Sequence, residues 1–414
     1  MPLFKNVNDR NHVKVWITNK SGEFQFSNHM RTFLFLIILS AWTIMSCKNQ
    51  DNHPDHTNHA NHSAHADHDH SHHELPVSPK GHNAVIKKYL DEIELIPIDS
   101  TEMSRTDYMS LIKGGTYDMG AEGEAAVQDE FPKHKVTVDS FWIDITEVTN
   151  EDFTAFTSAT GYLTTAEREL DVNEILAQLP PGYELPPDFD TSPMSLVFEA
   201  VKKGKPASPN TWWKPVADAS WRHPQGPESS ASDKPNHPAV HLSWFDAMAY
   251  CRWKGKRLPT ESEWEYAARG RLTNQIYPWG NDPISPQRAN YWQGEFPYEN
   301  LNKDGHISTA PVRSYEANAH GLYDMAGNVW EWCSDWYKND HYREKVATQD
   351  LNNPTGPDIS FDPDEPTIPK KVIRGGSFLC NDSYCSGYRV SARMKSSPDT
   401  GLEHTGCRCA RSVE

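Results

Sequence analysis

Proline and glycine recur so often in this sequence that long helices and strands are disfavoured over most of its length. The 414 residues include 30 Pro, 23 Gly and 14 Trp, and hydrophobic residues make up 37% of the chain. Proline lacks a backbone N–H donor, and glycine loses more conformational freedom on folding than any other residue. We therefore expect a loop-rich globule with little regular secondary structure and a core built from aromatic side chains.

The region around residue 40 has the features of an export signal. The stretch "MRTFLFLIILSAWTIMSC" places Arg31 before an apolar run over 33–45, and the small residue Ser46 before Cys47. This run is shorter than the roughly 20 residues of a membrane span. A basic residue, a short apolar run and a small residue are typical of a cleaved secretory signal, with an uncleaved anchor as the alternative.

The end of this segment resembles a bacterial lipobox, which gives a set of expectations for the N-terminal part of the chain. Cys47 is predicted to become the lipidated N-terminus, anchored to a membrane of the bacterial cell envelope outside the cytoplasm. The expected segments are a non-native extension over 1–29, a lipoprotein signal peptide over 30–46 and a tether over 47–94.

Histidine dominates the first part of this tether. Nine of the 20 histidines lie in 51–73, mostly three residues apart, with no apolar residue larger than alanine or proline. Such a composition buries too little apolar surface to become ordered, which predicts a flexible segment. Because imidazoles bind Cu(II), Zn(II) and Ni(II), the segment is interpreted either as a metal-collecting arm or as a polar spacer. A metal store is a third, weaker interpretation of the whole protein.

Ordered structure is expected from Leu95, as one domain over 95–414. Short apolar or alternating stretches predict strands over 95–100, over 109–120 with a break at two glycines, and over 134–144. Residues 170–240 are rich in proline, serine and glycine, and we interpret them as ordered loop wrapped over the core.

Three helix starts share the same capping chemistry. Each has a hydroxyl residue followed three positions later by a carboxylate, and each segment closes within a residue or two of a glycine. The pairs are Thr149 with Asp152, Ser243 with Asp246, and Thr260 with Glu263. We therefore predict three short helices of about three turns each.

Several collinear motifs give the sequence a family resemblance. From about Ile112 to Arg411, the stretches "IKGGTYDMG", "HPAVHLSWFDAMAYCRWKGKRLPTESEWEYAARG", "GLYDMAGNVWEWCSDWY" and "RGGSFLCNDSYCSGYRVSARMKSSPD" follow one another as in formylglycine-generating enzyme, the sulfatase-modifying factor. The resemblance implies an α+β, C-type-lectin-like fold with low secondary-structure content. It also implies an oxidase that uses O2 to convert a cysteine in a Cys-x-Pro-x-Arg segment of unfolded sulfatase chains to Cα-formylglycine.

Cys380 and Cys385 stand where this family has its catalytic pair. Two thiolates on one loop suit Cu(I), a soft ion that prefers sulfur, and the resemblance implies that the client cysteine supplies a third sulfur. Without that context, two cysteines five positions apart in an exported protein would more often form a disulfide. Ser377 and Trp330 match residues that line the oxygen-side pocket in the family; a turn serine and a core tryptophan are their structural alternatives.

The resemblance also assigns the remaining polar candidates. It implies a structural disulfide between Cys251 and Cys409, and it leaves Cys333 and Cys407 as thiols without a partner. Three arginines are candidates for holding the client peptide, with structural salt bridges as an equal alternative: Arg389, Arg393 and Arg408. Asn381 departs from the histidine that is common at this position in the family.

Two oxygen-rich stretches coincide with calcium sites of the family. Calcium takes six to eight oxygen ligands and accepts backbone carbonyls from irregular loops. From residues alone these would be solvated turn carboxylates; the resemblance favours structural Ca²⁺. The first set is Asn290, Tyr291, Asp304 and His306, and the second is Asp324, Gly327, Val329 and Glu331.

The charge balance narrows the classes of function. With 40 basic and 57 acidic residues the formal charge is −17, which argues against nucleic-acid binding. Together with the lipobox-like segment, the family resemblance makes a lipid-anchored, copper-dependent formylglycine-generating oxidase the leading hypothesis. The main rival is a non-enzymatic envelope lipoprotein of the same fold that acts as a binding or scaffold module.

Overall fold

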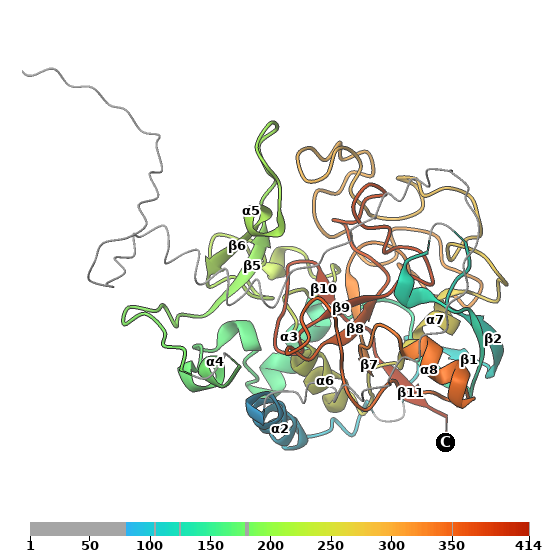
Figure 1. The fold of residues 1–414 in the computed structure, drawn as a ribbon, viewed down its shortest axis with the longest axis horizontal. Helices are drawn as coiled ribbons and strands as arrows, with labels where there is room; N and C mark the ends of the chain where they lie inside the picture. The colour runs from blue at the N-terminus through green and yellow to red at the C-terminus, as the bar shows by residue number, and fades with distance from the viewer. Residues whose placement is uncertain (1–79, 103–104, 124–125, 179–181, 350, 414) are drawn as a thin grey trace, which may run out of the picture.

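The computed structural model describes residues 80–102, 105–123, 126–178, 182–349 and 351–413. The predicted extension, signal peptide, lipidation site Cys47 and His-rich segment therefore lie outside the described residues. The described part combines short helices and strands with long irregular connections (Figure 1). This is the α+β architecture with little regular structure that the sequence predicts.

The helices of the described residues are short, and the longest has 15 residues. They are α2 (Lys80–Glu94), α3 (Asn150–Thr160), α4 (Val172–Gln178), α5 (Pro209–Trp212), α6 (Trp244–Trp253), α7 (Glu261–Ala268) and α8 (His341–Thr348). Single 3-10 turns are η1 (Gln128–Glu130), η2 (Thr165–Glu167) and η3 (Ala231–Asp233). The three predicted helices are confirmed as α3, α6 and α7. At each start the hydroxyl accepts from the N–H of the predicted carboxylate residue, whose side chain bonds back to the cap.

The strands form small sheets. They are β1 (Met109–Ile112), β2 (Gly115–Met119), β3 (His134–Val138), β4 (Phe141–Asp144), β5 (Met194–Phe198), β6 (Trp213–Ala217), β7 (Trp330–Trp336), β8 (Lys371–Arg374), β9 (Met394–Ser396), β10 (Thr405–Gly406) and β11 (Ala410–Ser412). The sheet orders are β1-β4-β11, β10-β7-β8-β9, β2-β3 and β5-β6. In the four-stranded sheet β10 runs parallel to β7, while β8 is antiparallel to both β7 and β9.

The predicted strand over 134–144 is wrong in its continuity, because the chain turns at Asp139. The first half, β3, pairs with β2, whereas the second half, β4, lies between β1 and β11. A Cβ on Gly114 would lie 2.6 Å from the Val138 carbonyl oxygen. The predicted break at the two glycines is confirmed, and it brings the β1–β2 connection directly against this turn.

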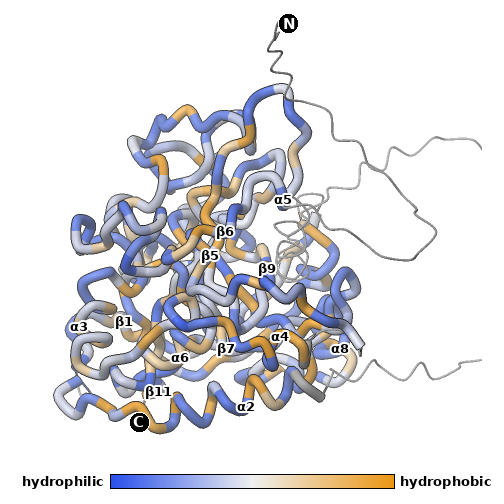
Figure 2. The backbone as a smooth tube through the Cα atoms, turned by 90° about the vertical axis from the view of Figure 1, so that its left-hand side faces the viewer, coloured by the Kyte–Doolittle hydropathy of each residue, from blue (hydrophilic) through white to orange (hydrophobic). Residues whose placement is uncertain are grey.

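The predicted start of order at Leu95 is also wrong. Residues 95–100 form a turn and loop, in which the Asp99 N–H donates to the Trp253 carbonyl at 2.8 Å. The helix α2 precedes it, inside the range assigned to the flexible tether. Its buried residues Val85, Tyr89 and Ile93 are spaced four apart and face the core, and Figure 2 shows apolar and polar positions alternating along this helix. The 170–240 region likewise contains α4, β5, α5 and β6, which the sequence reading missed.

The core is aromatic, as expected from the composition. The largest side chains that are fully buried include Trp221, Trp264, Trp330 and Trp332. Tyr89 of α2 stacks on Phe245 of α6 with ring centroids 4.5 Å apart. These rings let a chain with short elements bury a large apolar area, since each aromatic side chain buries about 150–250 Å².

Candidate functional site around Cys380 and Cys385

Cys380 and Cys385 lie side by side on the loop that follows β8. Their sulfur atoms are 3.1 Å apart, which is longer than the roughly 2.05 Å of a disulfide bond. Both side chains are buried, with 2% and 7% of their surface exposed. The Ser377 N–H also points to the Cys380 sulfur at 3.4 Å. The loop therefore presents two adjacent thiol groups that have not formed a disulfide.

Two glycines allow the chain to turn from β8 into this loop. Gly375 and Gly376 have φ angles of 94° and 77°, a region that other residues rarely adopt. A Cβ on Gly376 would also lie 2.6 Å from the Tyr388 backbone nitrogen. The turn at Gly376 therefore packs against the backbone of Tyr388, just after the two cysteines. This contact keeps the cysteine loop close to the sheet.

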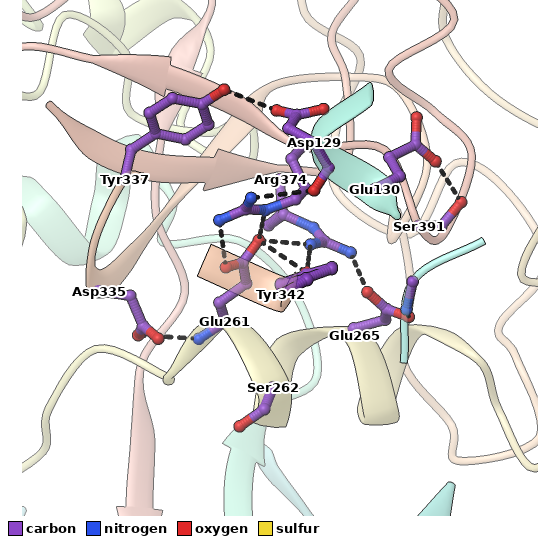
Figure 3. Close-up of polar contacts among 12 residues, drawn as sticks. Asp129, Glu130, Glu261, Ser262, Glu265, Asp335, Tyr337, Tyr342, Arg374 and Ser391 are labelled. Carbon is purple, nitrogen blue, oxygen red and sulfur yellow. Dashed lines mark hydrogen bonds and ion pairs between the residues drawn. The ribbon is translucent and has the colours of Figure 1, made fainter. Parts of the chain in front are cut away.

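A buried ion-pair network fixes the end of β8 to α7. Figure 3 shows Arg374 between Glu261 and Glu265. Its guanidinium donates to Glu261 Oε1 at 2.7 Å and to Glu265 Oε2 at 2.6 Å, and it also donates to the Val390 carbonyl at 2.6 Å. Burial raises the pKa of the Glu261 carboxyl, but Arg393 and Arg374 together lower it by more, so that it falls to about 2. The network holds both ends of the cysteine loop, because Val390 follows it.

A small cavity of about 30 Å³ opens beside the two thiols, which is room for about two water-sized molecules. Its walls come from six parts of the chain. They are lined by Trp212, Trp213, Phe296, Trp330, Ser377, Leu379, Cys380, Tyr384, Cys385, Met394 and His404. The predicted set of two cysteines, Ser377 and Trp330 is thus brought together at one cavity.

Ser377 and Trp330 have defined places in this wall. The Ser377 hydroxyl accepts from the Leu379 N–H at 3.2 Å, and no acceptor for its own hydrogen is found in the part of the chain that the structure describes. The Trp330 indole fills the space over Gly387, where a Cβ would lie 2.2 Å from Trp330 Cη2 and 3.2 Å from Cys380 Sγ. Ser377 can therefore donate a hydrogen bond into the cavity, while Trp330 is packed wall.

The sequence reading missed His404 and the aromatic rim. His404 is buried and stands edge-on to Trp213, with ring centroids 4.9 Å apart. Burial lowers the pKa of His404 to about 3 and keeps the ring neutral. On the rim, Phe296 stacks on Tyr384 at 4.6 Å and meets Trp212 at 5.4 Å. The sequence shows Tyr384 next to Cys385 and the adjacent pair Trp212-Trp213. Nothing in the local sequence indicates that these residues meet in the fold.

The three arginines proposed as client-binding residues are structural. Each guanidinium is buried and makes short bonds to a carboxylate from a distant part of the chain. Arg389 binds Glu130 at 2.6 Å, Arg393 binds Glu261 at 2.7 Å and Arg408 binds Glu331 at 2.6 Å. Buried charges need such partners, so these side chains are committed to the fold and the salt-bridge alternative describes them better.

The disulfide expected between Cys251 and Cys409 is present, with an S–S distance of 2.14 Å. It joins α6 to the C-terminal segment next to β11. Cys333 and Cys407 are buried and outside any disulfide. Burial raises the pKa of both thiols well above the ordinary value, which disfavours the reactive thiolate form. The bridge leaves Cys380 and Cys385 available for another role.

A second, larger cavity of about 160 Å³ lies between α2, α4, η2, β5 and the loop at 399–401. Four carboxyl groups, Glu169, Asp171, Glu174 and Asp399, line it together with two cationic groups, Lys88 and Arg168. Lys88 is paired with Glu174 at 2.5 Å and Arg168 with Glu92 at 2.7 Å. The β5–β6 hairpin contributes Met194 to this cavity and Trp213 to the cysteine cavity, so one hairpin forms a wall of both.

Buried oxygen atoms without a partner lie in both sets of calcium candidates. Asn290 Oδ1 and Asp324 Oδ1 are buried and accept no hydrogen bond within the described residues, and the same holds for Glu147 Oε2. Glu331, in contrast, is already held by Arg408 and by the Trp264 indole N–H at 2.7 Å. The orphaned oxygens fit a hard cation such as Ca²⁺, while Glu331 has little capacity left as a ligand.

The described residues contain neither a preformed cluster of metal-binding side chains nor a membrane span. No three side chains among His, Cys, Asp and Glu converge there on a common metal position. Among the described helices, none has the length and apolarity to span a bilayer.

Comparisons with known proteins point to one family. Residues 97–413 match the model of the sulfatase-modifying factor enzyme 1-like domain. The chain is 45% identical over 307 residues to formylglycine-generating enzyme of Thermomonospora curvata, an alignment that covers 73% of this chain and 92% of that protein. The mouse protein of the same name is 42% identical over 311 residues, covering 72% and 73%.

Other similar proteins differ in their names. The bovine inactive C-alpha-formylglycine-generating enzyme 2 is 36% identical over 316 residues, covering 74% of this chain and 88% of that protein. Among solved structures, PvdO from Pseudomonas aeruginosa is 23% identical with a TM-score of 0.48, covering 74% and 94%. The chain is therefore similar both to proteins named formylglycine-generating enzyme and to proteins named inactive.

Proposed function

The chain belongs to the family of sulfatase-modifying factor enzyme 1-like domains, and we propose that it converts a cysteine of sulfatase polypeptides to Cα-formylglycine. The observation that carries this proposal is the pair of thiols of Cys380 and Cys385, 3.1 Å apart and outside any disulfide. The similarity to formylglycine-generating enzymes supports the same activity. A scaffold role would place no requirement on these two thiols.

The thiol pair would hold Cu(I), and two soft sulfur donors on one buried loop fit this ion. Bound copper would supply the activation of O2, which side chains alone rarely achieve. The chain itself offers two sulfurs here and no third acidic or imidazole ligand in the described residues. This leaves room for the sulfur of the client cysteine.

The residues around the pair would prepare the reaction. The aromatic wall of Trp330 and the rim of Trp212, Phe296 and Tyr384 would exclude water from the client thiol. The hydroxyl of Ser377 would donate a hydrogen bond to an oxygen species in the cavity. His404 would remain neutral, since its pKa of about 3 keeps a second positive charge out of this apolar space.

The larger cavity would receive the rest of the client segment. A Cys-x-Pro-x-Arg motif carries a guanidinium four residues after the cysteine. The cavity shares the β5–β6 wall with the cysteine site, and its four carboxyl groups outnumber its two cationic groups. Opposite charge would attract the client arginine there, so this cavity would take the client-binding role first assigned to Arg389, Arg393 and Arg408.

Calcium is part of the proposal as a structural ion. Asn290, Asp304 and the carbonyls of Tyr291 and His306 would form one site, and Asp324 with the carbonyls of Gly327 and Val329 the other. Orphaned oxygens on Asn290 and Asp324 support both. Glu147, whose Oε2 also lacks a partner among the described residues, would replace Glu331 as the carboxylate of the second site.

The proposal also includes a place for the protein. A signal peptide over 30–46 and lipidation of Cys47 would anchor it in the bacterial cell envelope, where client sulfatases arrive unfolded. The His-rich segment would extend from that anchor, outside the cytoplasm. The net charge of −17 supports a protein partner rather than nucleic acid.

The test is a direct assay of the product. Purified protein is loaded with Cu(I) and incubated with O2, a thiol reductant and a peptide containing Cys-x-Pro-x-Arg, and the aldehyde is detected by mass. Conversion of the client's thiol-bearing carbon to an aldehyde, with release of hydrogen sulfide, removes two electrons. Reduction of O2 to water takes four, so the reductant supplies the other two. Cys380→Ser and Cys385→Ser should each lose the product.

Cys333→Ser is the matched control, because it makes the same chemical change at a buried thiol away from the cavity. It should retain activity. Near-ultraviolet circular dichroism of the buried tryptophans checks that each variant is folded. If copper-loaded protein binds the peptide but forms no aldehyde, the enzyme proposal fails and the scaffold alternative is favoured.

A further inference from the structure

The loop between the two cysteines is organised by one side chain, Asn381. Its amide nitrogen donates to the carbonyl oxygens of Trp292 at 3.0 Å and Gly294 at 3.1 Å. Its amide oxygen accepts from the backbone N–H of Ser383 at 2.9 Å and from the Ser383 hydroxyl at 2.6 Å. The side chain therefore uses both donors and both acceptor positions.

The backbone of the same residue holds the second cysteine. The Asn381 carbonyl accepts from the N–H of Cys385 at 2.7 Å and of Tyr384 at 3.0 Å. On the other side, the Trp292 N–H donates to the Cys380 carbonyl at 2.9 Å. Asn381 thus connects the chain at Cys380, the chain at Cys385 and the 292–294 segment, so its position sets where both sulfurs lie.

We propose that Asn381 is a positioning residue that fixes the separation of the Cys380 and Cys385 sulfurs by clamping their loop to residues 292–294. In this role it would act through the positions of the two cysteines and not on a client or a metal. The inference rests on the proposed function only in taking these thiols as the reactive pair; the positioning itself rests on the hydrogen bonds.

The 292–294 segment is a firm support for this clamp. The Gln293 carbonyl accepts from the Leu301 N–H at 2.7 Å, and Gln293 Oε1 accepts from the Asp304 N–H at 2.9 Å. Gly294 has a φ of 154°, and a Cβ there would lie 2.3 Å from the Glu299 carbonyl oxygen. Because this segment cannot shift freely, a loop attached to it keeps a defined geometry.

The test measures the thiol pair without copper or client. Full-length protein is equilibrated with reduced and oxidised glutathione, where the two thiols and one glutathione disulfide give the protein disulfide and two glutathione thiols. The fraction of the Cys380–Cys385 disulfide, read by mass after alkylation, gives the effective concentration of one thiol at the other. This quantity depends on how well the sulfurs are held together.

Asn381→Ala removes all four side-chain bonds, and we expect the effective concentration to fall at least tenfold. Asn381→Asp should lower the effective concentration further, because a carboxylate would face two carbonyl oxygens. Asn381→His keeps a ring N–H and should lie between wild type and alanine. Cu(I) affinity, measured by competition with a chelator, should follow the same order.

Asn318→Ala is the matched control. Asn318 has the same four-bond pattern, donating to the carbonyls of Ala267 and Ala268 and accepting from the N–H groups of His320 and Leu322. None of these four partner groups belongs to the cysteine loop, so its loss should change stability but leave the thiol equilibrium within twofold of wild type.

The outcomes separate the two proposals. The positioning role is overturned if the effective thiol concentration of Asn381→Ala lies within twofold of wild type, or if Asn318→Ala lowers it equally. This holds even if the protein makes formylglycine. If the Asn381 variants follow the predicted order of effective thiol concentrations but no aldehyde is formed, the positioning role is supported and the proposed function is contradicted. If Asn381→Ala does not fold, Ser383→Ala and Asn381→His carry the test: Ser383→Ala removes one of the four bonds and should give a smaller fall.

Discussion

Arg374 Nη2 lies 2.6 Å from Glu265 Oε2, and both side chains are fully buried. The two residues are 109 positions apart in the sequence. Arg374 begins the turn that leads to the cysteine loop, and Glu265 belongs to α7. The ion pair therefore fastens the strand that carries the candidate site to a helix on another part of the chain.

Removing this arginine should strongly destabilise the fold. Arg374→Met leaves the buried carboxylate of Glu265 with one cationic partner fewer, and breaking a buried pair costs about 3–5 kcal/mol. Urea unfolding followed by tryptophan fluorescence measures the loss. Lys87→Ala, which breaks the exposed pair with Asp91, should cost less than about 1 kcal/mol. Similar losses in both variants would contradict the structural role of the network.

The Cys251–Cys409 bridge should contribute substantially to stability. It closes a loop with a sequence separation of 158 residues, and in the chain-entropy model such a loop is worth roughly 4–5 kcal/mol. The double variant Cys251→Ala/Cys409→Ala should show this decrease in the free energy of unfolding. Its glutathione equilibrium at Cys380 and Cys385 should stay near wild type; a large change there would mean that the bridge also shapes the site.

The buried side chain of His241 should make the stability of the fold depend on pH. Burial lowers the pKa of His241 to about 4, while the unfolded value is about 6.5. As the pH falls below 6.5, the unfolded state therefore binds a proton at His241 before the folded state does. The contribution of this histidine to the free energy of unfolding is complete above pH 6.5 and decreases as the pH falls to about 4. Over that window the loss is about 3 kcal/mol.

The variant that tests this is His241→Asn, because asparagine tolerates the positive φ of 58° at this position. Its unfolding free energy should depend less steeply on pH between 6.5 and 4. Glu403 gives the opposite slope: burial raises its pKa to about 7, so its contribution is complete below about pH 4.5 and is lost as pH rises through 7. An unchanged slope in His241→Asn would show that other groups control the acid limb.

A single methyl group at Gly387 should damage the candidate site. A Cβ there would lie 2.2 Å from Trp330 Cη2 and 3.2 Å from Cys380 Sγ, so either the indole or the sulfur must move. Overpacking of this kind costs about 1–3 kcal/mol, and we expect at least a tenfold loss of aldehyde formation. Gly114→Ala is the control, since it clashes with the Val138 carbonyl at 2.6 Å far from the thiols and should keep the activity per folded molecule.

Calcium removal should lower the melting temperature. A ligand at a concentration 100-fold above its Kd stabilises the folded state by about 2.7 kcal/mol, which corresponds to a shift of roughly 4 °C for a domain of this size. A chelator should remove this shift, and added Ca²⁺ should restore it. In Asp304→Asn the response should shrink, because one ligand loses its charge. A melting temperature that ignores both chelator and Ca²⁺ would argue against structural calcium.

Much of the local structure could be predicted from short patterns. The three capping boxes at Thr149, Ser243 and Thr260 were recognisable because cap and carboxylate are three residues apart and satisfy each other's backbone groups. The resemblance placed the cysteine pair, Ser377 and Trp330, and the structure gathers them at one cavity. It did not place His404, which reaches the cavity through the pairing of β10 with β7.

The wrong predictions for residues 80–100 share a physical cause. The strand expected over 95–100 is a turn, because its backbone bonds to Trp253 at the end of α6 instead of to a strand. Residues 80–94, assigned to a tether, form a helix because their sparse apolar residues find a face of the core. Neither partner is visible in the local sequence.

The sequence by itself determined the helix caps, the glycine turns, the aromatic composition of the core and the presence of two thiols on one loop, since these depend on residues a few positions apart. Only the tertiary structure decided the role of the charged groups. Arg389 and Glu130 are 259 positions apart and meet at 2.6 Å. A buried charge must find its partner wherever the fold brings one, so spacing along the chain cannot tell a client-binding arginine from a structural one.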